Sequence, residues 1–160
     1  VDGMATALAQ FGTMPFRDVM QAAIGLAEEG IAVDWYLTLK VATMARELSL
    51  YPVTREIWLP GGLPPVTPAG APLARLKMKG LAGTLRRLAD AGPRDFYEGD
   101  IAAGIANDLR MMGGRLSAAD LAGFHARIVE PATTTYRNAR LALPPELTAG
   151  PTMLRALDPL

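Results

Sequence analysis

Apolar residues recur at intervals of three and four along most of the chain, and this spacing predicts a mainly helical protein. We expect helices over residues 3–10, between Pro15 and Gly30, from an Asp34 N-cap to Leu48, over 81–91 and over 101–109. Glycine follows several of these segments, as expected for a residue that readily adopts the left-handed C′ conformation. Pro52 is expected to prevent the third helix from continuing.

The period changes from helical to alternating after Phe124. Arg127–Glu130 and Arg140–Leu143 alternate as half-buried strands, separated by a Thr-rich connection and followed by Pro144-Pro145. Before them, Ser117 and Asp120 resemble a capping box at the start of a short helix. Ile57–Leu59 is a second, shorter β-prone patch. The pattern therefore predicts a mainly α fold with a small β element.

Residues 60–72 are rich in glycine and proline, which predicts an irregular surface loop more mobile than its flanking helices. The same composition also suits a hinge or a domain boundary. We favour a single mostly helical domain over residues 1–160, because the halves on either side are short and both need partners for their apolar faces.

Composition and charge exclude several classes of protein. The 160 residues carry 16 Lys and Arg against 16 Asp and Glu, so the basic excess of a nucleic-acid-binding protein is missing. There is no cysteine, which excludes a disulfide, a thiol nucleophile and a Zn–thiolate or Fe–S site. Apolar residues are dispersed, and no run of about 18 predicts membrane insertion. Because the sequence starts at Val1 and stops at Leu160 within a new apolar segment, we expect an excerpt or a processed product.

Few residues offer catalytic chemistry. His125 is the only histidine, so a multi-histidine metal site is excluded, and its position between a helix and a strand favours no catalytic role. Thr133–Thr135 is a hydroxyl run, but these threonines lack the free α-amino group that activates an N-terminal threonine. Neither Gly61-Gly62 nor Gly113-Gly114 continues into a phosphate-binding motif.

Asp95, Glu98 and Asp100 gather at the start of a helix, where carboxylates complement the helix dipole and are too few for a divalent-ion site. Arg86-Arg87 is expected to be a solvated helix edge, and Met111-Met112 is expected to fill core space. The residues alone therefore predict no catalytic, cofactor-binding or metal site.

Several groupings nevertheless occur together in one order. They are Val1-Asp2-Gly3-Met4, Phe11-Gly12-Thr13-Met14-Pro15, Leu26-Ala27-Glu28-Glu29-Gly30-Ile31, Gly92-Pro93, Phe96-Tyr97-Glu98-Gly99, Ile101-Ala102, Gly113-Gly114 with Asp120-Leu121, Tyr136-Arg137 and Pro144-Pro145. In this order the chain resembles the large subunit of the gamma-glutamyltranspeptidase family across essentially its whole length. The Phe-Tyr-x-Gly-x-Ile-Ala run is among the most specific parts.

The resemblance implies part of an αββα N-terminal-nucleophile hydrolase, made as a precursor that cleaves itself into two subunits. In such an enzyme the threonine that begins the small subunit attacks a γ-glutamyl amide such as glutathione, and the acyl group passes to water or an amino acid. The resemblance places this threonine beyond Leu160 and the arginine that binds the substrate carboxylate before Val1. The expected partners are therefore the small subunit and a γ-glutamyl substrate, without a cofactor.

Some positions depart from the family pattern. Asp2 and Ala22 stand where the family usually has proline, Ile31 where it has phenylalanine, and Asn138 where it has glycine; Pro144–Pro151 replaces a segment with Ser-Ser-Gly-Gly. These departures leave three alternatives open: a related acylase, an inactive paralogue and a non-catalytic helical interaction module. The resemblance leaves the periplasm or the cell exterior as candidate compartments.

Overall fold

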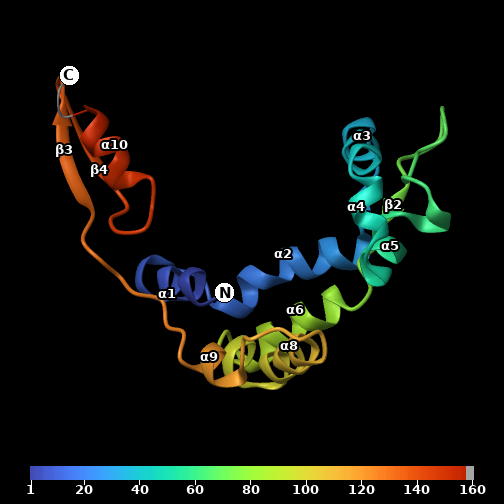
Figure 1. Ribbon diagram of the computed structural model, residues 1–160, viewed down its shortest axis with the longest axis horizontal. Helices are drawn as coiled ribbons and strands as arrows, with labels where there is room; N and C mark the ends of the chain where they lie inside the picture. The colour runs from blue at the N-terminus through green and yellow to red at the C-terminus, as the bar shows by residue number, and fades with distance from the viewer. Residues whose placement is uncertain (158–160) are drawn as a thin grey trace. The chain divides into compact units, whose positions relative to one another are not determined.

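The computed structural model describes residues 1–157, which divide into two compact units: the first is Val1–Phe124 and the second begins at His125 (Figure 1). The first unit is helical, apart from one short strand pair. Its elements are α1 (Asp2–Phe11), α2 (Phe16–Glu29), β1 (Ile31–Ala32), α3 (Trp35–Thr43), α4 (Ala45–Ser49), α5 (Pro52–Trp58), the 3-10 turn η1 (Pro60–Gly62), β2 (Arg75–Leu76), α6 (Leu81–Ala91), α7 (Asp95–Glu98), α8 (Asp100–Met111) and α9 (Ala118–Ala122).

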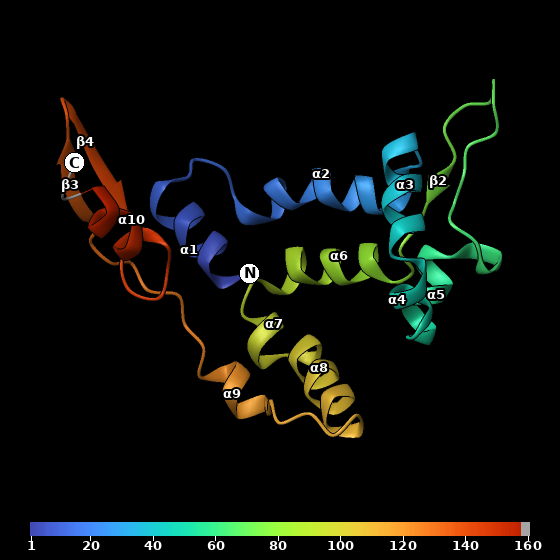
Figure 2. The same cartoon turned by 45° about the horizontal axis from the view of Figure 1, so that its top comes forward.

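Helices α2 and α6 lie side by side in both views (Figures 1 and 2). Ile24 of α2 and the pair Leu88 and Ala89 of α6 are buried, as expected for the apolar faces of two amphipathic helices. At the surface, Arg17 pairs with Asp90 at 3.0 Å. The helical spacing predicted both helices correctly, including their ends at Gly30 and Gly92.

Strands β1 and β2 pair antiparallel directly after Gly30, which has a φ of +90°. A Cβ atom at Gly30 would lie 2.8 Å from the carbonyl oxygen of Leu76. Glycine is therefore required here both by its backbone conformation and by the close approach of β2. Arg75 donates to the Gly30 carbonyl at 3.0 Å, which further joins the two segments.

The predicted third helix is divided into α3 and α4 at Met44, whose φ of −112° and ψ of 9° interrupt the helix. The Asp34 N-cap is confirmed, since its Oδ1 accepts from the Leu37 N–H at 2.7 Å. The β-prone patch Ile57–Leu59 was predicted wrongly, because Ile57 and Trp58 are helical. Pro52 occupies the first turn of α5, where its fixed φ favours a helix, and this start overrides the strand preference of the residues that follow.

The Gly/Pro-rich segment 60–72 begins with η1 and is otherwise irregular, as predicted. Thr67 ties the segment to β1 and β2: its hydroxyl donates to the Val33 carbonyl at 2.6 Å and accepts from the Ala74 N–H at 3.0 Å. Thr38 of α3 donates to the Pro65 carbonyl at 2.8 Å. These bonds hold the loop against α3; its greater mobility stays a prediction.

Helices α7, α8 and α9 pack together at the end of the first unit, around buried Tyr97, Ala102 and Leu121. The predicted capping box is confirmed. Ser117 Oγ accepts from the Asp120 N–H at 3.2 Å, and Asp120 Oδ2 accepts from the Ser117 N–H at 2.8 Å.

The second unit contains the hairpin of β3 (Ala132–Tyr136) and β4 (Ala139–Leu143), with α10 (Gly150–Leu157) against β3. The predicted strand at 127–130 is wrong: that stretch is irregular, and the threonines expected to form a connection are the strand itself. β-branched threonine fits a half-buried pleated surface, and the short turn after Tyr136 sets the pairing of Thr134 with Leu141.

The described residues are mainly helical, with two small two-stranded sheets, which confirms the predicted fold class. Among residues 1–157, no helix is both long and apolar enough to cross a membrane. The single-domain organisation over 1–160 stays a prediction.

Candidate functional site

A concentration of charged contacts surrounds α7, which contains the Phe-Tyr pair of the Phe-Tyr-x-Gly motif singled out in the sequence. Arg87 of α6 holds Asp95 with two hydrogen bonds, Nε to Oδ2 at 2.7 Å and Nη2 to Oδ1 at 2.8 Å. Its Nη1 lies 2.7 Å from Asp100 Oδ2. Arg87 is exposed at the edge of α6, as predicted for a solvated arginine, and in addition it binds these two carboxylates.

The hydrogen bonds from Arg87 are the main reason that the pKa of Asp95 lies below its usual range, and backbone N–H groups of Ile101 and Asp100 act in the same direction. The same hydrogen bonds raise the pKa of Arg87. The Asp95 side chain is only 8% exposed, whereas that of Asp100 is 81% exposed. Asp95 is thus the inner member of the acidic group that the sequence placed at a helix start.

The glycine of the motif has a steric role. A Cβ atom at Gly99 would collide with Asp95 Oδ1, because the Asp95 carboxylate turns back over the start of α8. Glycine therefore lets this carboxylate approach the backbone while it is held by Arg87.

A second arginine, Arg94, joins α7 to the end of the first unit. Its guanidinium donates to the carbonyl oxygens of Phe124 at 2.9 Å and Ala122 at 3.1 Å, and to Glu98. It also lies 5.0 Å from the centre of the Tyr97 ring, and its Nη1 is 3.8 Å from Asp2 Oδ1. The helical spacing did not indicate that Arg94 has a role. The one signal in the sequence was its position next to the Phe-Tyr motif.

Tyr97 completes this cluster. Its ring stacks on Phe124 at a centroid distance of 5.4 Å with 15° between the planes. Its hydroxyl oxygen accepts from the backbone N–H of Asp2 at 3.1 Å. The cluster of Arg87, Arg94, Asp95 and Tyr97 thereby connects α1, α6, α7, α8 and α9, and we call it the α7 cluster.

The chemistry of the α7 cluster is that of a structural support. The Arg87 guanidinium binds the carboxylates of Asp95 and Asp100, and that of Arg94 binds Glu98 and two backbone carbonyl oxygens, so both arginines hold parts of the chain together. Within residues 1–157, no three His, Cys, Asp or Glu residues lie together in a way that could hold a metal ion. The cluster is therefore suited to fixing helices in place.

The other residues considered in the sequence do not join this cluster. His125 is exposed at the first position of the second unit. Thr133 and Thr135 are exposed while Thr134 is half-buried, because successive strand side chains face opposite sides. The hydroxyl run therefore does not gather three groups at one point. The absence of catalytic residues from the chain stays a prediction.

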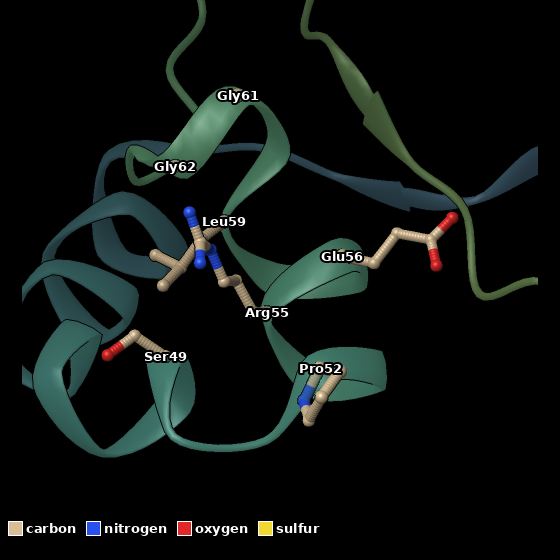
Figure 3. Close-up of a pocket in the computed structure, with 7 residues that line it drawn as sticks. All are labelled: Ser49, Pro52, Arg55, Glu56, Leu59, Gly61 and Gly62. Carbon is tan, nitrogen blue, oxygen red and sulfur yellow. The ribbon is translucent and has the colours of Figure 1, made fainter.

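One hollow of about 500 Å³ lies beside α5 and contains both a charged side chain and glycines (Figure 3). Figure 3 shows the Arg55 guanidinium beside Leu59, near the Gly61-Gly62 turn, while Glu56 extends away from it. Glu56 pairs instead with Lys79. A single exposed arginine offers an anion too few contacts to define a binding site.

Comparison with known proteins first identifies the class of enzyme to which the chain is similar. Over 143 residues the chain is 35% identical to the acylase ACY 1 proenzyme of Pseudomonas sp. strain SE83, covering 89% of this chain and 25% of that protein. It is 32% identical over 160 residues to the glutathione hydrolase proenzyme of Escherichia coli K12, and this match covers 99% of this chain and 27% of that protein. These relatives are proenzymes of the N-terminal-nucleophile hydrolase class.

The gamma-glutamyltranspeptidase family model matches residues 1–160, and the chain belongs to this family. Its structure matches the gamma-glutamyltranspeptidase of Helicobacter pylori with a TM-score of 0.84 and 25% identity, over 95% of this chain and 42% of that one. The transpeptidase CapD of Bacillus anthracis matches with a TM-score of 0.80 and 26% identity, over 97% of this chain and 50% of the CapD chain. The resemblance inferred from the motifs is confirmed, and the chain spans about a quarter of the length of these curated relatives.

Proposed function

We propose that this chain is a supporting part of the large subunit of a gamma-glutamyltransferase or amide hydrolase that is made as a precursor. In the complete enzyme, a threonine at the start of the small subunit forms an acyl-enzyme with a γ-glutamyl amide and passes the acyl group to water or an amino acid. The observation that carries the proposal is the family match over residues 1–160, combined with an α7 cluster whose arginines are engaged within the chain.

The role of the chain in that enzyme is to hold helices in place. Acyl transfer needs an activated nucleophile and donors aimed at the developing oxyanion, each positioned to a fraction of an ångström. The α7 cluster joins five helices through hydrogen bonds and ring stacking, so it can provide a rigid base for such groups. The small subunit is accordingly the proposed partner, and a γ-glutamyl compound is the proposed substrate.

Activity measurements with two proteins test this proposal. The purified 160-residue chain is expected to release the chromophore from a γ-glutamyl anilide only at the background rate. The full-length polypeptide encoded by the same gene is expected to cleave itself and then to turn over the anilide with saturation kinetics. Replacing the threonine at the new N-terminus with alanine is expected to abolish turnover. Saturable turnover by the 160-residue chain would contradict the proposal.

A related acylase is the second candidate function. It is favoured by the 35% identity to the Pseudomonas acylase and by a TM-score of 0.76 to the cephalosporin acylase of Bacillus halodurans. Offering the full-length polypeptide both a γ-glutamyl anilide and an acylated cephalosporin separates the two candidates. Preferential release of the acyl group from the cephalosporin would identify the acylase, and turnover of neither compound would favour an inactive paralogue or an interaction module.

A further inference from the structure

The Gly/Pro-rich loop between η1 and β2 forms one wall of a hollow. We call residues 63–73 of this loop the strap, which Figure 2 shows as a long excursion between α5 and β2. A hollow of about 580 Å³ is lined by Val66 and Leu73 of the strap and by Trp35 and Leu39 of α3, and we call it the α3 hollow. Because the strap supplies one wall, a movement of the strap changes access to the α3 hollow.

The strap buries little of its surface. Pro65 is buried, whereas Val66 is 63% exposed and all residues from 68 to 73 are exposed. The prolines of the strap have no N–H to donate to a backbone ladder. A segment that buries little apolar surface and lacks such donors is expected to open locally while the rest of the fold stays intact.

The two ends of the strap differ in how firmly they are held. After the strap, the Ala74 carbonyl accepts from the Val33 N–H at 2.8 Å, next to the pairing of β1 with β2. Before the strap, Gly61 and Gly62 have φ values of +70° and +85° and open space where a Cβ atom would stand. Glycines in open space can change their backbone torsions at little steric cost. The strap is therefore fixed at β2 and can turn about Gly61 and Gly62.

The Thr67 hydroxyl closes the strap onto its fixed end. It donates to the Val33 carbonyl at 2.6 Å and accepts from the Ala74 N–H at 3.0 Å, so one side chain of the strap binds both strand ends. Val33 itself lines the α3 hollow and is only 1% exposed. Release of Thr67 would therefore free the part of the strap that lies nearest to a buried residue of the hollow.

Thr38 of α3 makes a second contact with the strap, and this contact can be exchanged. Its hydroxyl has one hydrogen but lies close to two acceptors, the Pro65 carbonyl at 2.8 Å and the Asp34 carbonyl at 3.1 Å. A helical threonine can donate to the carbonyl four residues before it. When the strap moves away, the Thr38 hydroxyl can keep its hydrogen bond to Asp34, so opening does not leave this donor unsatisfied.

We propose that the strap is a lid that opens and closes over the α3 hollow, with the Thr67 hydroxyl as its latch. In the closed state Thr67 binds Val33 and Ala74. In the open state the strap has turned about Gly61 and Gly62, and the Val33 side chain is accessible from the hollow. The lid involves the first unit alone and does not depend on the proposed function.

Thiol labelling of the 160-residue chain tests the proposal, because the chain has no cysteine and a single introduced thiol reports on one position. Val33→Cys places the thiol at the α3 hollow. Ala89→Cys places it at an 8% exposed position of α6 and is the matched control. Under native conditions we expect a disulfide reagent to label the Val33→Cys thiol at least about tenfold faster than the Ala89→Cys thiol, since the strap opens more often than the helices unfold.

Second substitutions in the Val33→Cys chain separate opening of the lid from unfolding. Thr67→Val removes the latch hydroxyl and is expected to raise the labelling rate by about fivefold to tenfold. Thr43→Val is the control, because the Thr43 hydroxyl donates to the Lys40 carbonyl within α3, and it is expected to leave the rate unchanged. Tyr97→Phe removes the acceptor of the Asp2 N–H, far along the chain from the strap. It is expected to speed labelling of the Ala89→Cys thiol but not of the Val33→Cys thiol.

Several results would overturn the lid. Equal native labelling of the two thiols, or a rise of both with Tyr97→Phe, would mean that the α3 hollow opens only when the chain unfolds. A Val33→Cys thiol that reacts as fast in the native as in the denatured chain would mean that the strap never closes. An unchanged rate with Thr67→Val would exclude Thr67 as the latch.

A second measurement keeps the proposal testable if Val33→Cys fails to fold. Thermolysin cuts before large apolar residues, so it is expected to cut the native chain before Val66 or Leu73 when the strap is open. Thr67→Val is expected to speed this cleavage and Tyr97→Phe to leave it unchanged. Cleavage of the strap that follows Tyr97→Phe instead of Thr67→Val would contradict the proposal.

Discussion

The backbone N–H of Asp2 donates to the phenol oxygen of Tyr97 at 3.1 Å and joins residues that lie 95 positions apart in the sequence. The family resemblance places proline where Asp2 stands, and proline has no N–H to donate. A proline at position 2 could therefore not make this contact. It ties the first turn of α1 to the α7 cluster.

Removing the Tyr97 hydroxyl tests the strength of this contact. Tyr97→Phe keeps the ring stacked on Phe124 but removes the phenol oxygen that accepts from the buried Asp2 N–H. We expect the free energy of unfolding to fall by about 1 to 2 kcal/mol, measured by urea denaturation. Tyr36→Phe on the exposed face of α3 is the control and is expected to have no measurable effect.

The two hydrogen bonds from Arg87 to Asp95 depend on the planar fork of the guanidinium, which lysine cannot reproduce. We therefore expect Arg87→Lys to lower the melting temperature. The matched change Arg86→Lys affects a simpler pair with Glu28 on the neighbouring helix α2 and is expected to lower it less. Equal melting temperatures for the two variants would show that the two hydrogen bonds to Asp95 add nothing to stability.

Stability is expected to fall in acid because of Asp95. Its pKa is lowered in the folded state, so the folded protein binds a proton less readily than the unfolded chain. The stabilisation is therefore complete above the ordinary aspartate pKa of about 4 and is lost as the pH falls through the lower folded-state value. Asp120, whose pKa is lowered mainly by Ser117, acts in the same direction. Urea denaturation across this pH range should show a weaker dependence for Asp95→Asn than for the unaltered chain.

Two glycine substitutions are expected to change the free energy of unfolding in opposite directions. Gly30→Ala forces a side chain into a φ of +90° and against the Leu76 carbonyl, so we expect a loss of at least about 1 kcal/mol in the free energy of unfolding. Gly83 lies within α6 and has open space where a Cβ atom would stand, so Gly83→Ala is expected to stabilise by about 0.5 to 1 kcal/mol. A stabilising Gly30→Ala variant would contradict the account of the β1–β2 approach.

The parts of the fold that depend on nearby residues were predictable from the sequence. Helices α2 and α6, the Asp34 cap and the Ser117 capping box follow from side chains within a turn or two of one another. The second strand of the hairpin was predicted correctly, since β4 covers Arg140–Leu143. The first strand was placed too early, because its position depends on which face of the threonine run is covered by α10, and short alternating runs do not encode that.

The contacts of the α7 cluster were not predictable in the same way. Arg94 donates to carbonyl oxygens 28 and 30 residues away. Every residue has a backbone carbonyl, so the sequence does not indicate which of them an arginine will bind. The acidic group at α7 and the solvated Arg87 were each recognised, but their pairing was not. The sequence does not show that tertiary packing brings the edge of α6 beside Asp95.

The bond from Arg94 to the Phe124 carbonyl has a consequence for limited proteolysis. Phe124 is the last residue of the first unit, and the irregular stretch at 125–131 that follows contains Arg127, a trypsin target. Cleavage there would leave Phe124 bound within its own fragment, with its ring still stacked on Tyr97. Digestion is therefore expected to yield a resistant helical fragment that includes Phe124. A truncation ending at Ala122 would instead remove both the ring that stacks on Tyr97 and the carbonyl that accepts from Arg94.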